Sequence, residues 1–173
     1  MLDIPLCKPR ILLLLLVLAE SASAAPDDLP DFKFSAPQFF SVPVAARSFL
    51  GTTYAYTSAR ETRLFLSVIP IVDVEREFGR ISELDCVSLF LNEVASSHKG
   101  FFSNLQRRPL PVGDAKFVQF RWSGESGGIE KTGVLSCGVS GGWYLVVHFL
   151  DEIKSATNTF PLIRSALRTL SLP

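Results

Sequence analysis

Two glycine-rich breaks between alternating segments constrain the fold of this chain more than any other feature. The alternating segment Val118–Trp122 ends at Gly124–Gly128, and a second one, Leu135–Val139, ends at Ser140–Gly142 before a third, Trp143–Leu150. Apolar side chains at every second position are typical of half-buried strands, and short glycine-rich links join antiparallel neighbours. The sequence therefore predicts a three-strand antiparallel meander near the C-terminus.

Further strands are expected upstream of the meander. Thr52–Ser58 is rich in Thr and Tyr, and Arg63–Val68 alternates apolar residues with Arg63, Phe65 and Ser67. Both segments have the period of a half-buried strand.

Two helices are expected to cover the sheet. Apolar residues at helical spacing predict a long helix between Glu77 and Gln106, interrupted or kinked by Gly100. A short helix is expected from about Thr159 to Leu170, with Pro161 tolerated as a first-turn residue. The fold class is therefore α+β: an antiparallel sheet, both of its faces at least partly covered, with one long and one C-terminal helix.

This order of elements resembles a known family. The strand Trp143–Val147, followed by a helix that ends Leu167-Arg168-Thr169-Leu170, is similar to the Mog1/PsbP-like α/β/α sandwich over roughly Phe39–Leu172. The resemblance lies in topology and not in a diagnostic motif. Proteins of that fold act mostly as small adaptors or accessory subunits, so the resemblance implies such a role, and no functional residue is carried over.

The first 24 residues have the pattern of a secretory signal peptide. Lys8 and Arg10 flank the start of the apolar run Ile11–Ala19, and Ala22-Ser23-Ala24 matches a signal-peptidase site. This run of nine apolar residues is too short to span a bilayer, which takes about 20. We expect cleavage before Ala25, a periplasmic or extracellular location, and no stable membrane anchor after processing.

Processing would leave a tether and one domain. Residues 25–41 contain prolines and aspartates typical of an extended segment, and residues 42–173 are expected to form a single globular domain. The tether contains four phenylalanines, Phe32, Phe34, Phe39 and Phe40. They are candidates for an interaction surface, and the alternative is that they cover the domain's own core.

Charge narrows the class of partner. The chain has 17 basic and 17 acidic residues, and removing residues 1–24 takes away two of each sign, so the processed protein is neutral. Nucleic acids and anionic membranes normally require a basic excess, so neither is expected as the main partner. Another envelope or secreted protein is the expected partner.

The chain shows no convincing catalytic or metal-binding motif. Gly124–Gly128 and Gly138–Gly142 both match Gly-x-Ser-x-Gly, but each joins strand to strand, whereas a nucleophile elbow joins strand to helix. Neither His98 nor His148 has an Asp, Glu, Cys or His at metal-ligand spacing. We expect no catalytic residue, no metal ligand and no cofactor.

Two cysteines remain after processing, Cys86 and Cys137. An even count in an oxidising compartment favours a disulfide, which would close a loop of about 50 residues. The phase of the expected long helix favours two separate thiols, because it places Cys86 away from the apolar face. The sequence leaves both alternatives open.

These features together predict an exported, non-enzymatic accessory or binding protein of the cell envelope. One alternative is a small secreted hydrolase that uses carboxylates, since acidic residues gather near the start of the long helix. Its candidate acids are Asp73, Glu75, Glu77, Glu83 and Asp85. Another alternative is a carrier of a small apolar ligand held between the sheet and a helix.

Overall fold

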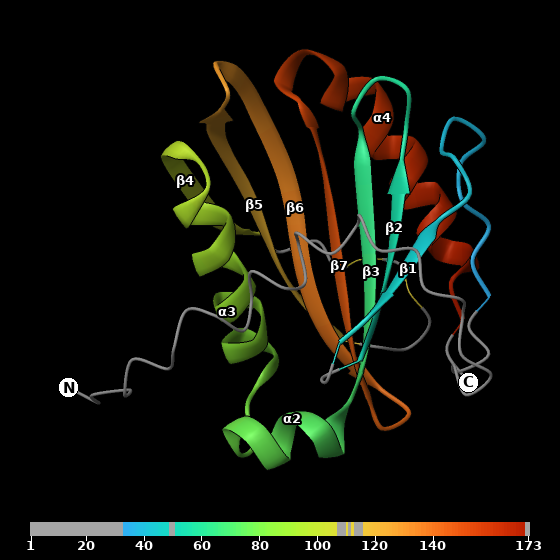
Figure 1. Ribbon diagram of the computed structural model, residues 1–173, viewed down its shortest axis with the longest axis vertical. Helices are drawn as coiled ribbons and strands as arrows, with labels where there is room; N and C mark the ends of the chain where they lie inside the picture. The colour runs from blue at the N-terminus through green and yellow to red at the C-terminus, as the bar shows by residue number, and fades with distance from the viewer. Residues whose placement is uncertain (1–32, 49–50, 107–109, 111, 113–115, 172–173) are drawn as a thin grey trace.

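One antiparallel sheet of seven strands organises the computed structural model, in the order β1-β2-β3-β7-β6-β5-β4 (Figure 1). The structure describes residues 33–48, 51–106, 110, 112 and 116–171. In chain order the elements are β1 (Val44–Arg47), β2 (Thr52–Thr57), β3 (Arg63–Pro70), α2 (Ile71–Phe78), α3 (Glu83–Ser96), β4 (Lys99–Gln106), β5 (Lys116–Ser126), β6 (Ile129–Ser140), β7 (Trp143–Glu152), α4 (Ile153–Ala166) and the 3-10 turn η2 (Leu167–Thr169).

The expected meander is formed by β5, β6 and β7. Ser126 pairs with Ile129 around the first turn, and Ser140 pairs with Trp143 around the second. The two residues inside each turn are glycines with positive φ, 61° and 79° in the first and 56° and 86° in the second. Two-residue hairpins favour such left-handed backbone, which glycine adopts without strain. The predicted α+β class is confirmed.

Helices lie on both faces of the sheet. In Figure 1, α4 lies behind the sheet and α3 lies in front of it. The contacts of α4 are with β6 and β7, and those of α3 are with β5 and β6. Successive side chains of β7 point to opposite faces of the sheet. Leu145, Val147 and Phe149 belong to the core beneath α4, and Tyr144 and Val146 belong to the core beneath α3. Each face of the sheet therefore carries its own apolar core.

The expected long helix between Glu77 and Gln106 is wrong at both ends. A separate helix, α2, precedes it, and the residues after Ser97 form the edge strand β4. Gly100 has a φ of 60°, which a continuing helix cannot accommodate. Phe102 and Leu105 continue the helical spacing in the sequence, but they are 64% and 58% exposed, so this spacing does not mark a buried face.

The C-terminal helix starts earlier than expected. It begins at Ile153, directly after Glu152 in extended conformation, so Pro161 lies in its third turn and not in its first. Its buried residues Ala156, Phe160 and Ile163 face the sheet. Packing of this face compensates for the backbone hydrogen bond that proline cannot make.

Candidate functional site

Three of the four tether phenylalanines pack on the domain's own core. Phe34 and Phe40 surround the ring of Tyr56, with centroid distances of 5.4 Å and 6.1 Å, and Phe39 lies 4.6 Å from Phe40. Burial of the Tyr56 hydroxyl raises its pKa to about 12, and the electrostatic interaction with Tyr54 is the second, smaller cause. Phe32 lies outside the described residues.

Backbone pairing also ties this segment to the domain. Lys33 forms an isolated antiparallel bridge with Ser171, and Phe40 forms one with Ser58. The geometry therefore corresponds to the alternative in which the rings cover the core.

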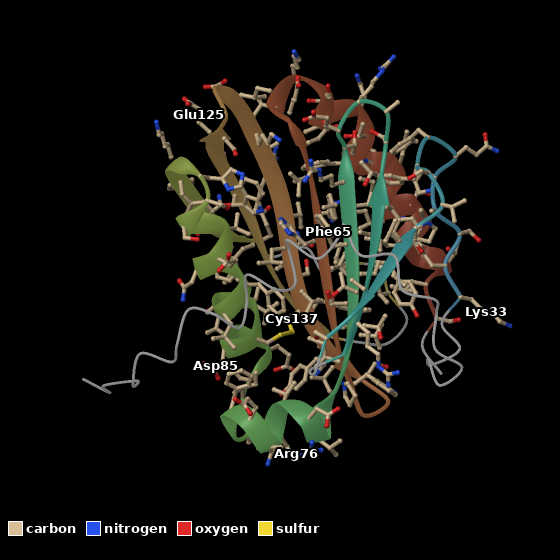
Figure 2. All side chains as sticks on the ribbon, in the orientation of Figure 1. Lys33, Phe65, Arg76, Asp85, Glu125 and Cys137 are labelled. Atoms are coloured by element: carbon tan, nitrogen blue, oxygen red, sulfur yellow. A yellow bond between two sulfur atoms is a disulfide. The ribbon has the colours of Figure 1, made fainter. Side chains whose placement is uncertain are left out.

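The structure joins Cys86 of α3 to Cys137 of β6 by a disulfide, with Cα atoms 6.2 Å apart. Both cysteines are buried, and Figure 2 labels Cys137 beside α3. The expectation from helical phase is wrong, because it places Leu84 on the apolar face, whereas Leu84 is 50% exposed and Cys86 is buried. In α3 alone, the buried face is Cys86, Val87, Leu91 and Val94, so Cys86 lies on the flank of the core and not opposite it.

The two histidines lie on either side of one tryptophan. Trp122 donates its Nε1 hydrogen to His148 Nε2 over 3.2 Å, and the ring of His98 lies 4.7 Å from that of Trp122. Phe65 stacks on the other side of His148 at 5.9 Å.

His148 is a core residue in this arrangement. It is 8% exposed, and burial, followed by the charge of His98, lowers its pKa to about 3. Within the described residues, no group of three or more His, Cys, Asp or Glu side chains could hold a metal ion.

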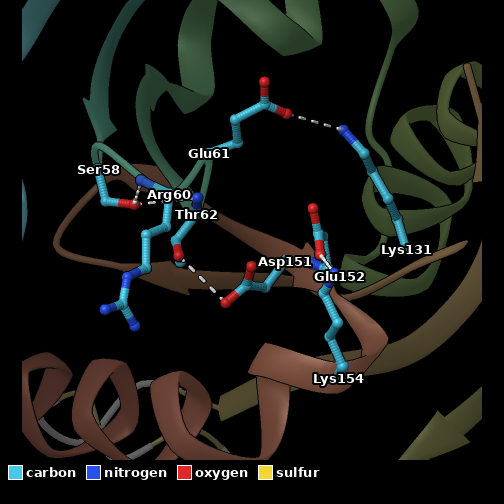
Figure 3. Close-up of polar contacts among 8 residues, drawn as sticks. All are labelled: Ser58, Arg60, Glu61, Thr62, Lys131, Asp151, Glu152 and Lys154. Atoms are coloured by element: carbon cyan, nitrogen blue, oxygen red, sulfur yellow. Dashed lines mark hydrogen bonds and ion pairs between the residues drawn. The ribbon is translucent and has the colours of Figure 1, made fainter. Parts of the chain in front are cut away.

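Asp151 is a second buried polar residue, 1% exposed at the end of β7 (Figure 3). One of its carboxylate oxygens accepts hydrogen bonds from Thr62 Oγ1 at 3.1 Å and from Thr159 Oγ1 at 2.7 Å. The other accepts from the backbone N–H of Glu152 at 2.8 Å. Asp151 therefore fastens the β2–β3 turn to α4, which is a structural role.

A hollow in the described part of the chain lies between α2, the start of α3 and the sheet. Its volume is about 540 Å³. The lining residues come from α2, from the α2–α3 connection, from the start of α3 and from the ends of β6 and β7: Ile71, Glu75, Arg80, Ile81, Ser82, Glu83, Asp85, Val139 and Tyr144. Tyr144 donates its hydroxyl hydrogen to the carbonyl of Ile81 over 2.7 Å and so holds the connection against the sheet.

The start of α3 determines the form of one wall of this hollow. Ser82 is the N-cap, and its hydroxyl accepts from the backbone N–H of Asp85 at 3.2 Å. The Asp85 carboxylate accepts in return from the backbone N–H and hydroxyl of Ser82, at 2.9 Å and 2.7 Å. This is a capping box, and its Ser-x-x-Asp spacing is the sequence signal that could have located the start of α3.

Two titratable groups of the hollow have shifted pKa values, Asp85 and Tyr144. The hydrogen bonds from Ser82 lower the pKa of Asp85, whereas a general acid needs a raised one. Burial, followed by the charges of Glu75 and Glu83, raises the pKa of Tyr144, so its phenol stays neutral.

The acidic residues expected near the helix start are not all brought together. Glu75, Glu83 and Asp85 line the hollow, but Asp73 and Glu77 do not. Asp73 instead pairs with Arg76 at 2.7 Å along α2. Ser126 and Ser140, the serines of the two Gly-x-Ser-x-Gly segments, end β5 and β6 and lead into the next strand.

A smaller hollow of about 260 Å³ lies at the opposite end of the sheet. It is lined by the starts of β4, β6 and α4 and by the end of β5: Lys99, Gly100, Ser123, Gly124, Glu125, Glu130 and Ile153. Glu125 marks this corner in Figure 2. The acidic residues expected near the helix start indicated part of the larger hollow, whereas no sequence motif indicated the smaller one, because its lining comes from distant segments. In the part of the chain that is described, no helix has the length and apolarity to cross a membrane.

No protein-family model matches the sequence, and no curated protein matches it in sequence. Solved structures do match in fold. The structure of LpqN, involved in cell envelope biogenesis of Mycobacterium tuberculosis, matches with a TM-score of 0.54 and 13% identity over 83% of each chain. The putative regulator PA94 of Pseudomonas aeruginosa, a protein of unknown function, matches with a TM-score of 0.50 and 14% identity over 89% of this chain and 92% of that chain.

A third similar structure is the solution structure of cyanobacterial PsbP from Synechocystis sp. PCC 6803. It has a TM-score of 0.49 and 7% identity over 87% of this chain and 98% of that chain. The matches to LpqN and PA94 show a likeness of fold without likeness of sequence, as expected for a resemblance in topology alone.

Proposed function

We propose that this protein is an exported, non-enzymatic accessory or binding protein of the cell envelope. The observation that carries the proposal is the disulfide between Cys86 and Cys137, the two cysteines that remain if the first 24 residues are removed. Disulfides of this structural kind form in oxidising compartments and are rare in the cytosol. The signal-peptide pattern of residues 1–24 supports the same compartment.

The polar groups of the described residues support binding over catalysis. His148 and Asp151 are buried and occupied by packing and hydrogen bonds, and Asp85 serves in a helix cap. The larger hollow has a charged rim, which does not suit the apolar ligand of a carrier. LpqN, a protein of the same fold, is described as involved in cell envelope biogenesis, and an accessory role there fits this proposal.

Export is tested by expressing the full chain in a bacterium with a secretory pathway. We expect the intact mass of the protein in the periplasm or medium to correspond to a start at Ala25. Thiol labelling under denaturing conditions should find no free thiol before reduction and two after it. A Leu14→Arg variant, whose charge interrupts the apolar run, is the control and should stay unprocessed in the cytosol with its thiols reactive.

Two outcomes would overturn the proposal of export: a full-length mass in the cytosol for the unaltered chain, or two reactive thiols in the processed protein.

The binding role is tested in the native host. The processed protein should co-purify, after cross-linking in intact cells, with an envelope protein in fixed proportion, and recovery of this protein alone would contradict that role.

A further inference from the structure

The two edges of the sheet are built differently. At one edge, β1 is four residues long, follows Pro43 and ends in Arg47. Short strands, prolines and charges are the usual protection against pairing with another chain. At the other edge, β4 is eight residues long and carries one charge, Lys99, at its start. An edge strand leaves half of its backbone N–H and C=O groups free for a further strand.

Apolar side chains lie on both faces of the open edge. Phe102 pairs with Ser123, and Leu105 pairs with Phe120, so these two side chains point to opposite faces of the sheet. They are 64% and 58% exposed. The irregularity in β4 lies between Lys99 and Phe102, and pairing with β5 is regular from Phe102 to Gln106. A strand added here would find apolar contacts on each face.

The smaller hollow lies next to this edge and has one negative charge in excess, because two Glu side chains and one Lys side chain line it. Ser123, the partner of Phe102, lines it together with Lys99, Glu125 and Glu130. Lys99 is opposite Glu125, and Glu125 is in turn opposite Glu130 on the next strand. Like charges directly opposite one another destabilise a sheet. Neither carboxylate has an ion-pair partner among the described residues, so this pair suits a basic group supplied from outside.

The size of the edge favours an extended segment over a second copy of the chain. Pairing of two copies along β4 would bring together one eight-residue strand from each. A stable protein interface buries about 800 Å² per partner from 20–30 residues, which one strand edge does not supply. A peptide that adds a strand needs only the backbone groups of the edge and a few side-chain pockets.

We propose that the free edge of β4 binds an extended segment of a partner protein as an added strand. In this arrangement an apolar side chain of the segment packs on Phe102, and a Lys or Arg side chain reaches Glu125 on the neighbouring strand β5. The inference rests on the proposed binding role, but it is tested with purified protein and does not depend on export.

The probe is an acetylated ten-residue peptide of alternating Val and Thr with a Lys at each end. Two further peptides are its controls: one with Glu in place of Lys, and one with N-methyl groups on alternate backbone nitrogens. Backbone NMR should show shifts and slower hydrogen exchange at Phe102–Gln106 on adding the Lys peptide. The Glu peptide and the N-methylated peptide should each bind at least tenfold more weakly.

Variants separate the edge from the rest of the surface. Phe102→Lys should weaken the Lys peptide at least tenfold, whereas Val44→Lys on the exposed edge β1 is the matched control and should not. Glu125→Lys should reverse the preference in favour of the Glu peptide. Melting temperatures establish that each variant is folded.

Two results with the peptides would overturn the inference: NMR shifts located at β1 or at the α2–α3 hollow, or equal affinity for the Lys and Glu peptides. Two results with the Phe102→Lys variant would also overturn it. The variant could bind the Lys peptide as tightly as the unaltered protein does, or the unaltered protein could form a dimer in sedimentation that the variant does not form. Each of these leaves the export test untouched, so failure here and failure of the proposed function are distinguishable.

Discussion

At the scale of single residues, the protonation of His148 couples stability to pH. Its pKa is lowered from 6.5 to about 3 in the fold, because burial disfavours the charged ring. Below pH 6.5 the unfolded chain therefore takes up a proton that the folded chain refuses. The stability is fully present above pH 6.5 and falls by roughly 1.4 kcal/mol per pH unit down to about pH 3, which amounts to a loss of about 2 kcal/mol at pH 5.

Urea unfolding at pH 8, 7, 6 and 5 measures this slope. His148→Gln is the informative variant, because its amide oxygen can still accept from Trp122 but does not titrate. Its stability should change little between pH 7 and pH 5. Parallel curves for the variant and the unaltered protein would show that His148 is not the group responsible.

Glu61 carries backbone strain at the β2–β3 turn, with a φ of 62° (Figure 3). A residue with a side chain in this region costs about 1 kcal/mol relative to glycine. Its ion pair with Lys131 is long, at 3.8 Å, and the Glu61 side chain is 61% exposed, so the pair contributes little.

Glu61→Gly should therefore be more stable than Glu61→Ala by about 1 kcal/mol, since both variants lose the ion pair and only alanine keeps the strain. Chemical denaturation of both variants provides the comparison. Equal stabilities would mean that the turn relaxes without cost.

At the scale of elements, strands were predicted better than helices because their signals are local. The paired glycines Gly127-Gly128 and Gly141-Gly142 fix two turns and thereby three strands. The residues Lys99–Gln106 have no comparable alternation, and they form a strand because they pair with β5 and because Phe101 stacks on Trp122 at 6.1 Å. Tertiary pairing of this kind has no signature in the segment itself.

Pro161 provides a test at the element scale. It lies inside α4 and is exposed, so replacing it disturbs no core contact. Proline in a helix interior costs about 3 kcal/mol, part of which a bent helix recovers. Pro161→Ala should raise the free energy of unfolding by roughly 1–3 kcal/mol. Ser165→Ala, another exposed position of α4, is the control and should gain at most about 0.5 kcal/mol. A similar change in both variants would contradict the assignment of strain to Pro161.

At the scale of the whole molecule, the sequence predicted the layers but not the surfaces. Alternation in β7 indicated two covered faces, because each face leaves its own set of apolar residues. The lining of the α2–α3 hollow comes from α2, α3, β6 and β7, and the open edge exists because, among the described strands, β4 has a neighbour on one side only. The hollow and the open edge both depend on how elements that are distant in the sequence pack together. The periodicity of apolar residues within one segment does not predict that packing.

The segment before β1 decides where the folded unit begins. Phe34, Phe39 and Phe40 pack against the core around Tyr56, so this segment should contribute to stability and not act only as a tether. A variant lacking residues 25–41 should lose roughly 3 kcal/mol or more of its free energy of unfolding, because three partly buried rings are removed. A variant lacking residues 25–32 is the control, since it keeps all three rings. Thermal and urea unfolding of both would locate the boundary, and equal stability of the two would assign the rings to an interface with a partner.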